Sequence, residues 1–132
     1  MKGLQQGPDQ KYVKIQATLK HYTAYSVENN RGHDNANISA YDMTDSFLRQ
    51  YEMGFVQGKA SGVMCSYNLI DGTPNCASPA LLNSQIREEW GRPDALVVSD
   101  CGALGNMRAD PTNWSPTEVV ANSLNAASRQ AI

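Results

Sequence analysis

The chain has 132 residues, 41% of them hydrophobic, which is enough for a single domain with an apolar core. Its formal net charge of −2 gives no basis for binding nucleic acid or an anionic membrane surface, since both attract basic proteins. No stretch approaches the roughly 18 apolar residues of a membrane-spanning helix, and the first residues lack the apolar core of a signal peptide. We therefore expect neither nucleic acid nor a membrane as a partner.

The first predicted unit is a strand near residues 12–20, a polar loop, and a helix at about 40–56. Ser39 and Asp42, three residues apart, resemble a capping box at the start of this helix. Its apolar side chains recur on one face, which predicts that this face is buried. They are Phe47, Leu48, Tyr51 and Phe55.

The second predicted unit is a strand near residues 62–67, a turn at 71–74, and another helix. Ser78 is the expected N-cap of this helix, Pro79 suits its first position, and Gly91 ends it. Its expected buried face consists of Leu82, Ile86 and Trp90.

The third predicted unit is a strand at residues 96–99, a long loop through Asp110 and Pro111, and a helix that begins after Ser115. Alternating strands and helices are typical of an α/β fold with a parallel sheet and right-handed crossovers. Three such units are too few to close a (β/α)8 barrel and would leave sheet edges uncovered. We therefore expect this chain to be a fragment of a larger domain.

Polar side chains follow the apolar strands of all three units. Asp100 ends the third strand, Lys20 and His21 end the first, and residues 64–68 end the second. The carboxyl ends of parallel strands meet at one edge, where α/β folds keep their chemistry. Asp100 is thus the first candidate for a functional residue. From the strand alone, a simple capping role for Asp100 remains an equal alternative.

The cysteines and histidines do not predict a metal site. Cys65 and Cys76 could form a disulfide across the turn at 71–74 if the protein is secreted, which leaves Cys101 unpaired. The segment with His33 is typical of a hydrophilic loop, and the cysteines lack zinc-site spacing. We expect no metal and no cofactor.

Three motifs lie at the strand ends. They are Lys20-His21-Tyr22-Thr23-Ala24-Tyr25, Val63-Met64-Cys65-Ser66-Tyr67-Asn68 with Asp71-Gly72-Thr73-Pro74, and Val97-Val98-Ser99-Asp100-Cys101. Together they resemble family 3 glycoside hydrolases of the β-xylosidase and α-L-arabinofuranosidase branch, over about residues 3–124. The resemblance implies that residues 1–132 are part of an N-terminal catalytic TIM-like (β/α)8 barrel, about three βα units of it. It also implies that the general acid/base belongs to a second domain absent from this chain.

The resemblance assigns roles to individual residues. Asp100 matches the family's catalytic nucleophile, Lys20 and His21 match a pair that binds sugar hydroxyls in the −1 subsite, and Met64 and Tyr67 match side chains that line it. Neighbouring strand residues point to opposite faces, so Lys20 and His21 can reach one sugar only if the backbone there is irregular, through a strained or cis peptide. The alternatives are a solvated charge for Lys20, a loop histidine with its hydrogen bonds satisfied for His21, and core packing for Met64 and Tyr67.

The implied activity is that of a retaining, exo-acting β-glycosidase, a β-1,4-xylosidase of xylan breakdown. Cys101 is also expected among the substrate-binding residues, and it favours the xylosidase branch, because the β-glucosidase branch usually has Trp after the nucleophile. The alternatives are a β-glucosidase of the same family and a non-catalytic, truncated remnant. The expected partners are an oligosaccharide or glycoside substrate and the remaining parts of a parent enzyme. The parent is expected to be secreted.

Overall fold

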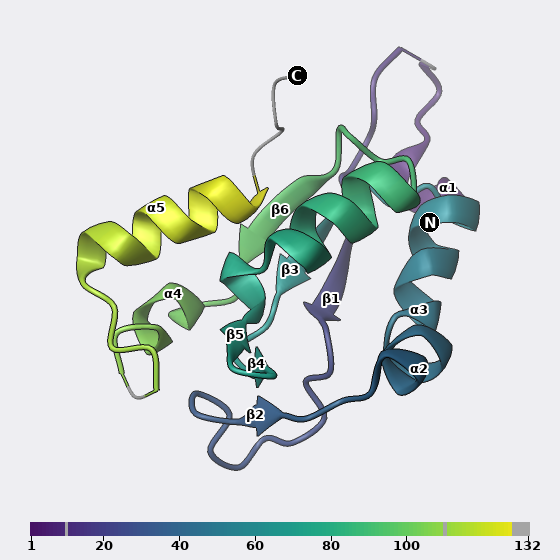
Figure 1. Cartoon of the computed structure of the whole chain (residues 1–132). Coiled ribbons are helices and arrows are strands. Elements are labelled where there is room, and N and C mark those ends of the chain that lie inside the picture. The colour runs from purple at the N-terminus through teal and green to yellow at the C-terminus, as the bar shows by residue number, and fades with distance from the viewer. Residues whose placement is uncertain (10, 110, 128–132) are drawn as a thin grey trace.

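The protein folds around a three-stranded parallel sheet, shown in the computed structural model, which describes residues 1–9, 11–109 and 111–127 (Figure 1). The sheet order is β1-β3-β6, formed by Thr18–Tyr22, Gly62–Cys65 and Leu96–Ser99. Each crossover between these strands contains helix, so the predicted α/β class is confirmed. The third strand has the predicted bounds, and the second ends two residues earlier than predicted.

The prediction for the first strand was wrong in position, since β1 starts at Thr18 rather than near residue 12. Strand length is set by the available partner, and β3 begins at Gly62, which pairs with Thr18. Just before β1, the Ala17 N–H donates to the side chain of Gln5 at 3.2 Å. Gln5 belongs to a short helix, α1 (Lys2–Gln5), which the sequence did not predict.

The first crossover is helical from residue 40 to residue 57 except at Leu48, in agreement with the predicted helix. It consists of α2 (Ala40–Asp42), η1 (Met43–Phe47), α3 (Arg49–Glu52) and η2 (Met53–Gln57), of which η1 and η2 are π-helical. The predicted cap is present, because the Asp42 N–H donates to Ser39 Oγ at 3.0 Å.

The second crossover begins with a hairpin where only a turn was predicted. Strands β4 (Leu69–Ile70) and β5 (Thr73–Pro74) pair antiparallel, with β2 (Asn35–Ala36) parallel to β4. Asp71 and Gly72 join them with φ of 47° and 81°. Two consecutive positive φ values are those of a type I′ hairpin turn.

Helix η4 (Ala80–Glu89) completes this crossover after a 3-10 turn, η3 (Asn75–Ala77). As predicted, Ser78 caps η4 by accepting the Leu81 N–H at 3.3 Å. Gly91, with φ of 62°, follows its end.

The segment after β6 contains a short helix, α4 (Ala103–Asn106), inside the predicted loop. The final helix, α5 (Pro116–Ala127), was predicted, and its capping box forms: the Ser115 N–H donates to Glu118 Oε2 at 2.8 Å. No helix among residues 1–9, 11–109 and 111–127 is long and apolar enough to cross a membrane.

The hydrophobic core lies between the helices and one face of the parallel sheet. Figure 1 shows η4, the teal-green helix, crossing this face. The predicted helix faces contribute to it: Phe55, Leu82 and Ile86 have no exposed surface. On β3, Val63 and Cys65 are buried whereas Met64 between them is half-buried. One face of the sheet is therefore more covered than the other, and Leu96 is 41% exposed.

Candidate active site

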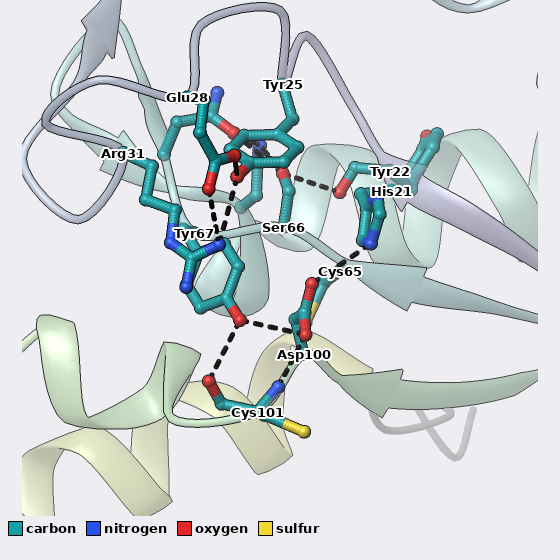
Figure 2. Close-up of polar contacts among 12 residues, drawn as sticks. His21, Tyr22, Tyr25, Glu28, Arg31, Cys65, Ser66, Tyr67, Asp100 and Cys101 are labelled. Carbon is teal, nitrogen blue, oxygen red and sulfur yellow. Dashed lines mark hydrogen bonds and ion pairs between the residues drawn. The ribbon is translucent and has the colours of Figure 1, made fainter.

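Asp100 lies at the carboxyl end of β6, where three polar groups surround its carboxylate (Figure 2). Oδ1 accepts the Cys101 N–H at 2.6 Å and lies 2.9 Å from the Tyr67 hydroxyl, which donates to it. Oδ2 lies 3.2 Å from His21 Nε2. The side chain of Asp100 is only 13% exposed, so these contacts replace much of its hydration. Residues from the ends of all three parallel strands thus meet at one carboxylate.

The surroundings favour the ionised form of Asp100. Burial opposes ionisation, but the hydrogen bonds from Cys101 and Tyr67 and the electrostatic effects of His21 and Lys20 outweigh it, so the pKa of Asp100 lies below its ordinary value. An ionised carboxylate is an acceptor only and can act as a nucleophile. Asp100 is therefore held as an anion at neutral pH, which is the form that nucleophilic catalysis requires.

Tyr67 is kept protonated by the same contact. Its hydrogen bond to Asp100, partial burial and the charge of Asp100 raise the pKa of Tyr67. The hydroxyl also lies 3.0 Å from the Cys101 carbonyl oxygen, a second acceptor for its single proton. Tyr67 thus serves as a neutral donor at the rim of the site.

The backbone that carries Lys20 and His21 is irregular, as predicted. The peptide bond between them is cis, as is that between Tyr22 and Thr23, and the pairing of β1 with β3 shifts register between Leu19 and Tyr22. The Tyr51 hydroxyl donates to the His21 carbonyl at 2.5 Å and holds this segment from the first crossover. Lys20 is exposed but close enough for its charge to act on Asp100.

A buried polar cluster supports the site from below. Asn75 Nδ2 donates to the Thr23 carbonyl at 2.8 Å and to Ser66 Oγ at 2.6 Å, and Asn68 Oδ1 accepts from Ser66 Oγ at 2.8 Å. All four residues are at most 1% exposed. Because buried polar groups cost free energy unless they are paired, this cluster fixes the loops after β1 and β3 against each other. No pattern in the sequence predicted this cluster, although buried loops need such amides to satisfy their backbone groups.

Cys65 and Cys76 form a disulfide with a Cα–Cα distance of 5.1 Å, as the sequence allowed for a secreted protein. Cys101 is exposed and not disulfide-bonded. In the part of the chain that the structure describes, no group of His, Cys, Asp and Glu side chains could hold a metal ion.

The structure brings most of the predicted site residues together. His21, Tyr67 and Cys101 contact the Asp100 carboxylate directly, and Lys20 acts on it through its charge. The remaining predicted residue, Met64, is half-buried on β3, where it pairs with Val98. The capping alternative for Asp100 describes only part of its environment, since Oδ2 faces a side chain from another strand.

Comparison with known proteins identifies the family. The family model described as the glycosyl hydrolase family 3 N terminal domain matches residues 1–128. The chain belongs to glycosyl hydrolase family 3. Among curated members, the chain is 39% identical to "Beta-D-xylosidase 3" of Arabidopsis thaliana over 131 residues, which cover 94% of this chain and 17% of that protein.

Two solved glycosidase structures share the fold of this chain. A GH3 exo-β-xylosidase, solved with a xylobiose aziridine activity-based probe, superposes with a TM-score of 0.82 at 30% identity, over 95% of this chain and 17% of that one. A β-glucosidase from Erythrobacter marinus superposes with a TM-score of 0.81 at 27% identity, over the same shares. This chain therefore spans about one sixth of the length of these relatives.

Proposed function

We propose that residues 1–132 are part of the catalytic (β/α)8 barrel of a retaining, exo-acting β-glycosidase, with β-1,4-xylosides as substrates and xylan breakdown as its role. The observation that carries the proposal is the Asp100 carboxylate, which is held as an anion at the carboxyl edge of the sheet by His21 and Tyr67. The less covered face of the parallel sheet also supports this proposal. Strands of a closed barrel are covered on both faces, so the missing strands of a barrel would cover this face.

In the proposed reaction, Asp100 attacks the anomeric carbon of the sugar as the bond to the leaving oxygen breaks. A second carboxyl group about 5–5.5 Å from the nucleophile protonates that oxygen and later activates the water that hydrolyses the glycosyl ester. We assign this acid/base to a second domain of the parent enzyme. The product keeps the configuration of the substrate, because the anomeric carbon is inverted twice.

The −1 subsite is proposed to form around Asp100. Lys20 and His21 donate hydrogen bonds to sugar hydroxyls, and Met64 and Tyr67 line the subsite. Donors of this kind stabilise the transition state most when their geometry is fixed beforehand. The buried cluster below the site supplies that fixation for the loops that carry His21 and Tyr67.

Two observations bear on the sugar and on the compartment. The similarity to proteins named β-xylosidases and the small Cys101 after the nucleophile favour xylosides. The similarity to a β-glucosidase supports glucosides as the alternative substrate class. The Cys65–Cys76 disulfide supports secretion of the parent, because disulfides persist in oxidising compartments.

The test uses the full-length protein that contains this chain. Turnover of nitrophenyl β-xyloside, α-arabinofuranoside and β-glucoside distinguishes the substrate classes. Asp100→Asn keeps the shape of the side chain but removes the anion, so turnover should fall by roughly 10⁴-fold or more while the affinity for the sugar changes little. Asp94→Asn is the matched control, because Asp94 precedes β6 rather than following it.

A fluorinated mechanism-based xyloside gives an independent readout, since it should form an ester with Asp100 that mass spectrometry locates. A label on a different carboxylate, or near-normal turnover by Asp100→Asn, would overturn the assignment. A full-length wild-type protein that cleaves none of the three glycosides would instead support the non-catalytic alternative.

A further inference from the structure

The loop between β1 and β2 places three side chains beside the site that have no role in the mechanism above: Tyr25, Glu28 and Arg31. The Arg31 guanidinium lies over the ring of Tyr67, 4.5 Å from its centroid (Figure 2). Arg31 Nη1 donates to Glu28 Oε1 at 2.9 Å and to the Tyr25 hydroxyl at 3.4 Å, and that hydroxyl in turn donates to Glu28. We call these three residues the loop triad.

The loop triad contacts both side chains that reach Asp100 from other strands. The Tyr25 ring meets His21 edge-on, with 5.4 Å between centroids, and lies 5.7 Å from the ring of Tyr67. Arg31 covers the face of the same Tyr67 ring. Tyr25 and Arg31 therefore contact the two side chains whose positions determine how Asp100 is held.

Stability does not account for this arrangement. The Arg31–Glu28 pair is exposed, with 47% and 71% of the two side chains accessible, and exposed ion pairs contribute little to folding. A cation over an aromatic face, in contrast, fixes the ring and draws electron density from it. For a phenol this makes the hydroxyl a stronger hydrogen-bond donor, and the Tyr67 hydroxyl donates to Asp100 at 2.9 Å.

We propose that Arg31 is a positioning residue that acts on Asp100 through Tyr67, and that Tyr25 and Glu28 hold the guanidinium over the ring. The inference rests on the proposed function, in which Asp100 is the nucleophile. Arg31 keeps the Tyr67 hydroxyl directed at Asp100 and so favours the anionic nucleophile. Without Arg31, the ring is free to turn its hydroxyl toward the Cys101 carbonyl, the second acceptor at 3.0 Å.

The expected pH effect follows from the groups that face Asp100. These are Lys20 and His21 from β1, Tyr67 after β3, and the N–H of Cys101 after β6. A weaker hydrogen bond from Tyr67 raises the pKa of Asp100, because that bond stabilises its ionised form. Since attack requires the ionised form, the acidic limb of kcat/KM should move to higher pH.

The first experiment compares variants of the full-length enzyme on nitrophenyl β-xyloside. Arg31→Gln should lower kcat/KM about tenfold and move the acidic limb to higher pH, and Arg31→Lys should restore part of both, because it keeps a cation over the ring. Tyr67→Phe should also move the acidic limb to higher pH. The double variant Tyr67→Phe/Arg31→Gln should have nearly the same kcat/KM as Tyr67→Phe alone, since Arg31 acts through Tyr67. The matched control is Arg49→Gln, which breaks another exposed pair three residues apart, with Glu52, and should change neither readout.

A second experiment does not depend on activity. With 3-fluorotyrosine at position 67, fluorine NMR follows the titration of that phenol, which should move to higher pH in Arg31→Gln because a nearby cation favours the phenolate. Additive effects of Arg31→Gln and Tyr67→Phe, or an unchanged fluorine titration, would overturn the proposal. An inactive wild-type enzyme whose fluorine titration still responds to Arg31→Gln would instead overturn the proposed function and leave the contact between Arg31 and Tyr67 standing.

Discussion

The Cys65–Cys76 disulfide should contribute measurably to stability. The two residues are 11 positions apart, and closing a loop of this length contributes about 2–3 kcal/mol to the free energy of unfolding, according to the chain-entropy model. Both residues are buried, at 2% and 3% exposure, so the bridge joins the end of β3 to the turn before η4 inside the core. Cys65→Ala/Cys76→Ala should lower stability by at least this amount.

The effect on the site should be smaller than the effect on stability. The Cys65 carbonyl still accepts the Asp100 N–H, 3.1 Å away, when the sulfur is removed. The hydrogen bonds of Asn75 to Thr23 and Ser66 also remain. If Asp100 acts as proposed, kcat/KM of the folded double variant at low temperature should therefore fall by less than about tenfold.

The assay combines denaturation of the full-length protein with hydrogen exchange of peptides from residues 62–86, which report local opening around the bridge. Exchange there should accelerate in the double variant and in the reduced wild type. Cys101→Ser is the control for removal of a thiol, since Cys101 is exposed and unbridged. Free thiols at 65 and 76 in the oxidised protein, or exchange rates unchanged by the double variant, would refute this reasoning.

Two further predictions concern the sheet and the charge of Asp100. Gly62→Ala should lower the free energy of unfolding by about 1–3 kcal/mol, measured by urea denaturation, because its Cβ would lie 2.5 Å from the Leu96 carbonyl oxygen. Gly105→Ala is the control and should not destabilise the protein, since no atom lies within 4 Å of the added Cβ. The lowered pKa of Asp100 contributes stability that is present above its unfolded pKa of about 3.9 and is lost as pH falls through the folded pKa. Acid denaturation should accordingly depend less steeply on pH in Asp100→Asn, and an identical pH dependence would contradict the assigned charge.

The elements predicted well from the sequence are those whose signals are local. Ser39, Ser78 and Ser115 cap their helices through contacts within three residues, as their positions in the sequence indicated. The bounds of β1 were not predictable in this way, since they depend on where Gly62 starts the neighbouring strand. Val13 and Ile15, two apolar residues inside the predicted strand, are more than half exposed.

The contacts of the loop triad could not be predicted from the sequence, for a different reason. In the sequence, Glu28 and Arg31 indicate only a hydrophilic loop, and their i,i+3 pairing is the one contact that spacing could suggest. Their significance depends on Tyr67, which lies 36 residues beyond Arg31 and meets it only because the loops after β1 and β3 are joined. Contacts between loops carry no periodicity, so neither hydrophobic pattern nor propensity encodes them.

The environment of Asp100 depends on strand register more than on any single motif. Tyr22 pairs with Cys65, and Cys65 with Ser99, so the three strands end level with one another. Of the groups that lower the pKa of Asp100, only the Cys101 N–H is local, and the others arrive from β1 and from the loop after β3. A slip of β6 by one residue would turn Asp100 to the opposite face and separate it from His21 and Tyr67. The same carboxylate, in the same sequence, would then lose both the contacts that favour its ionised form and the orientation that the proposed nucleophilic attack requires.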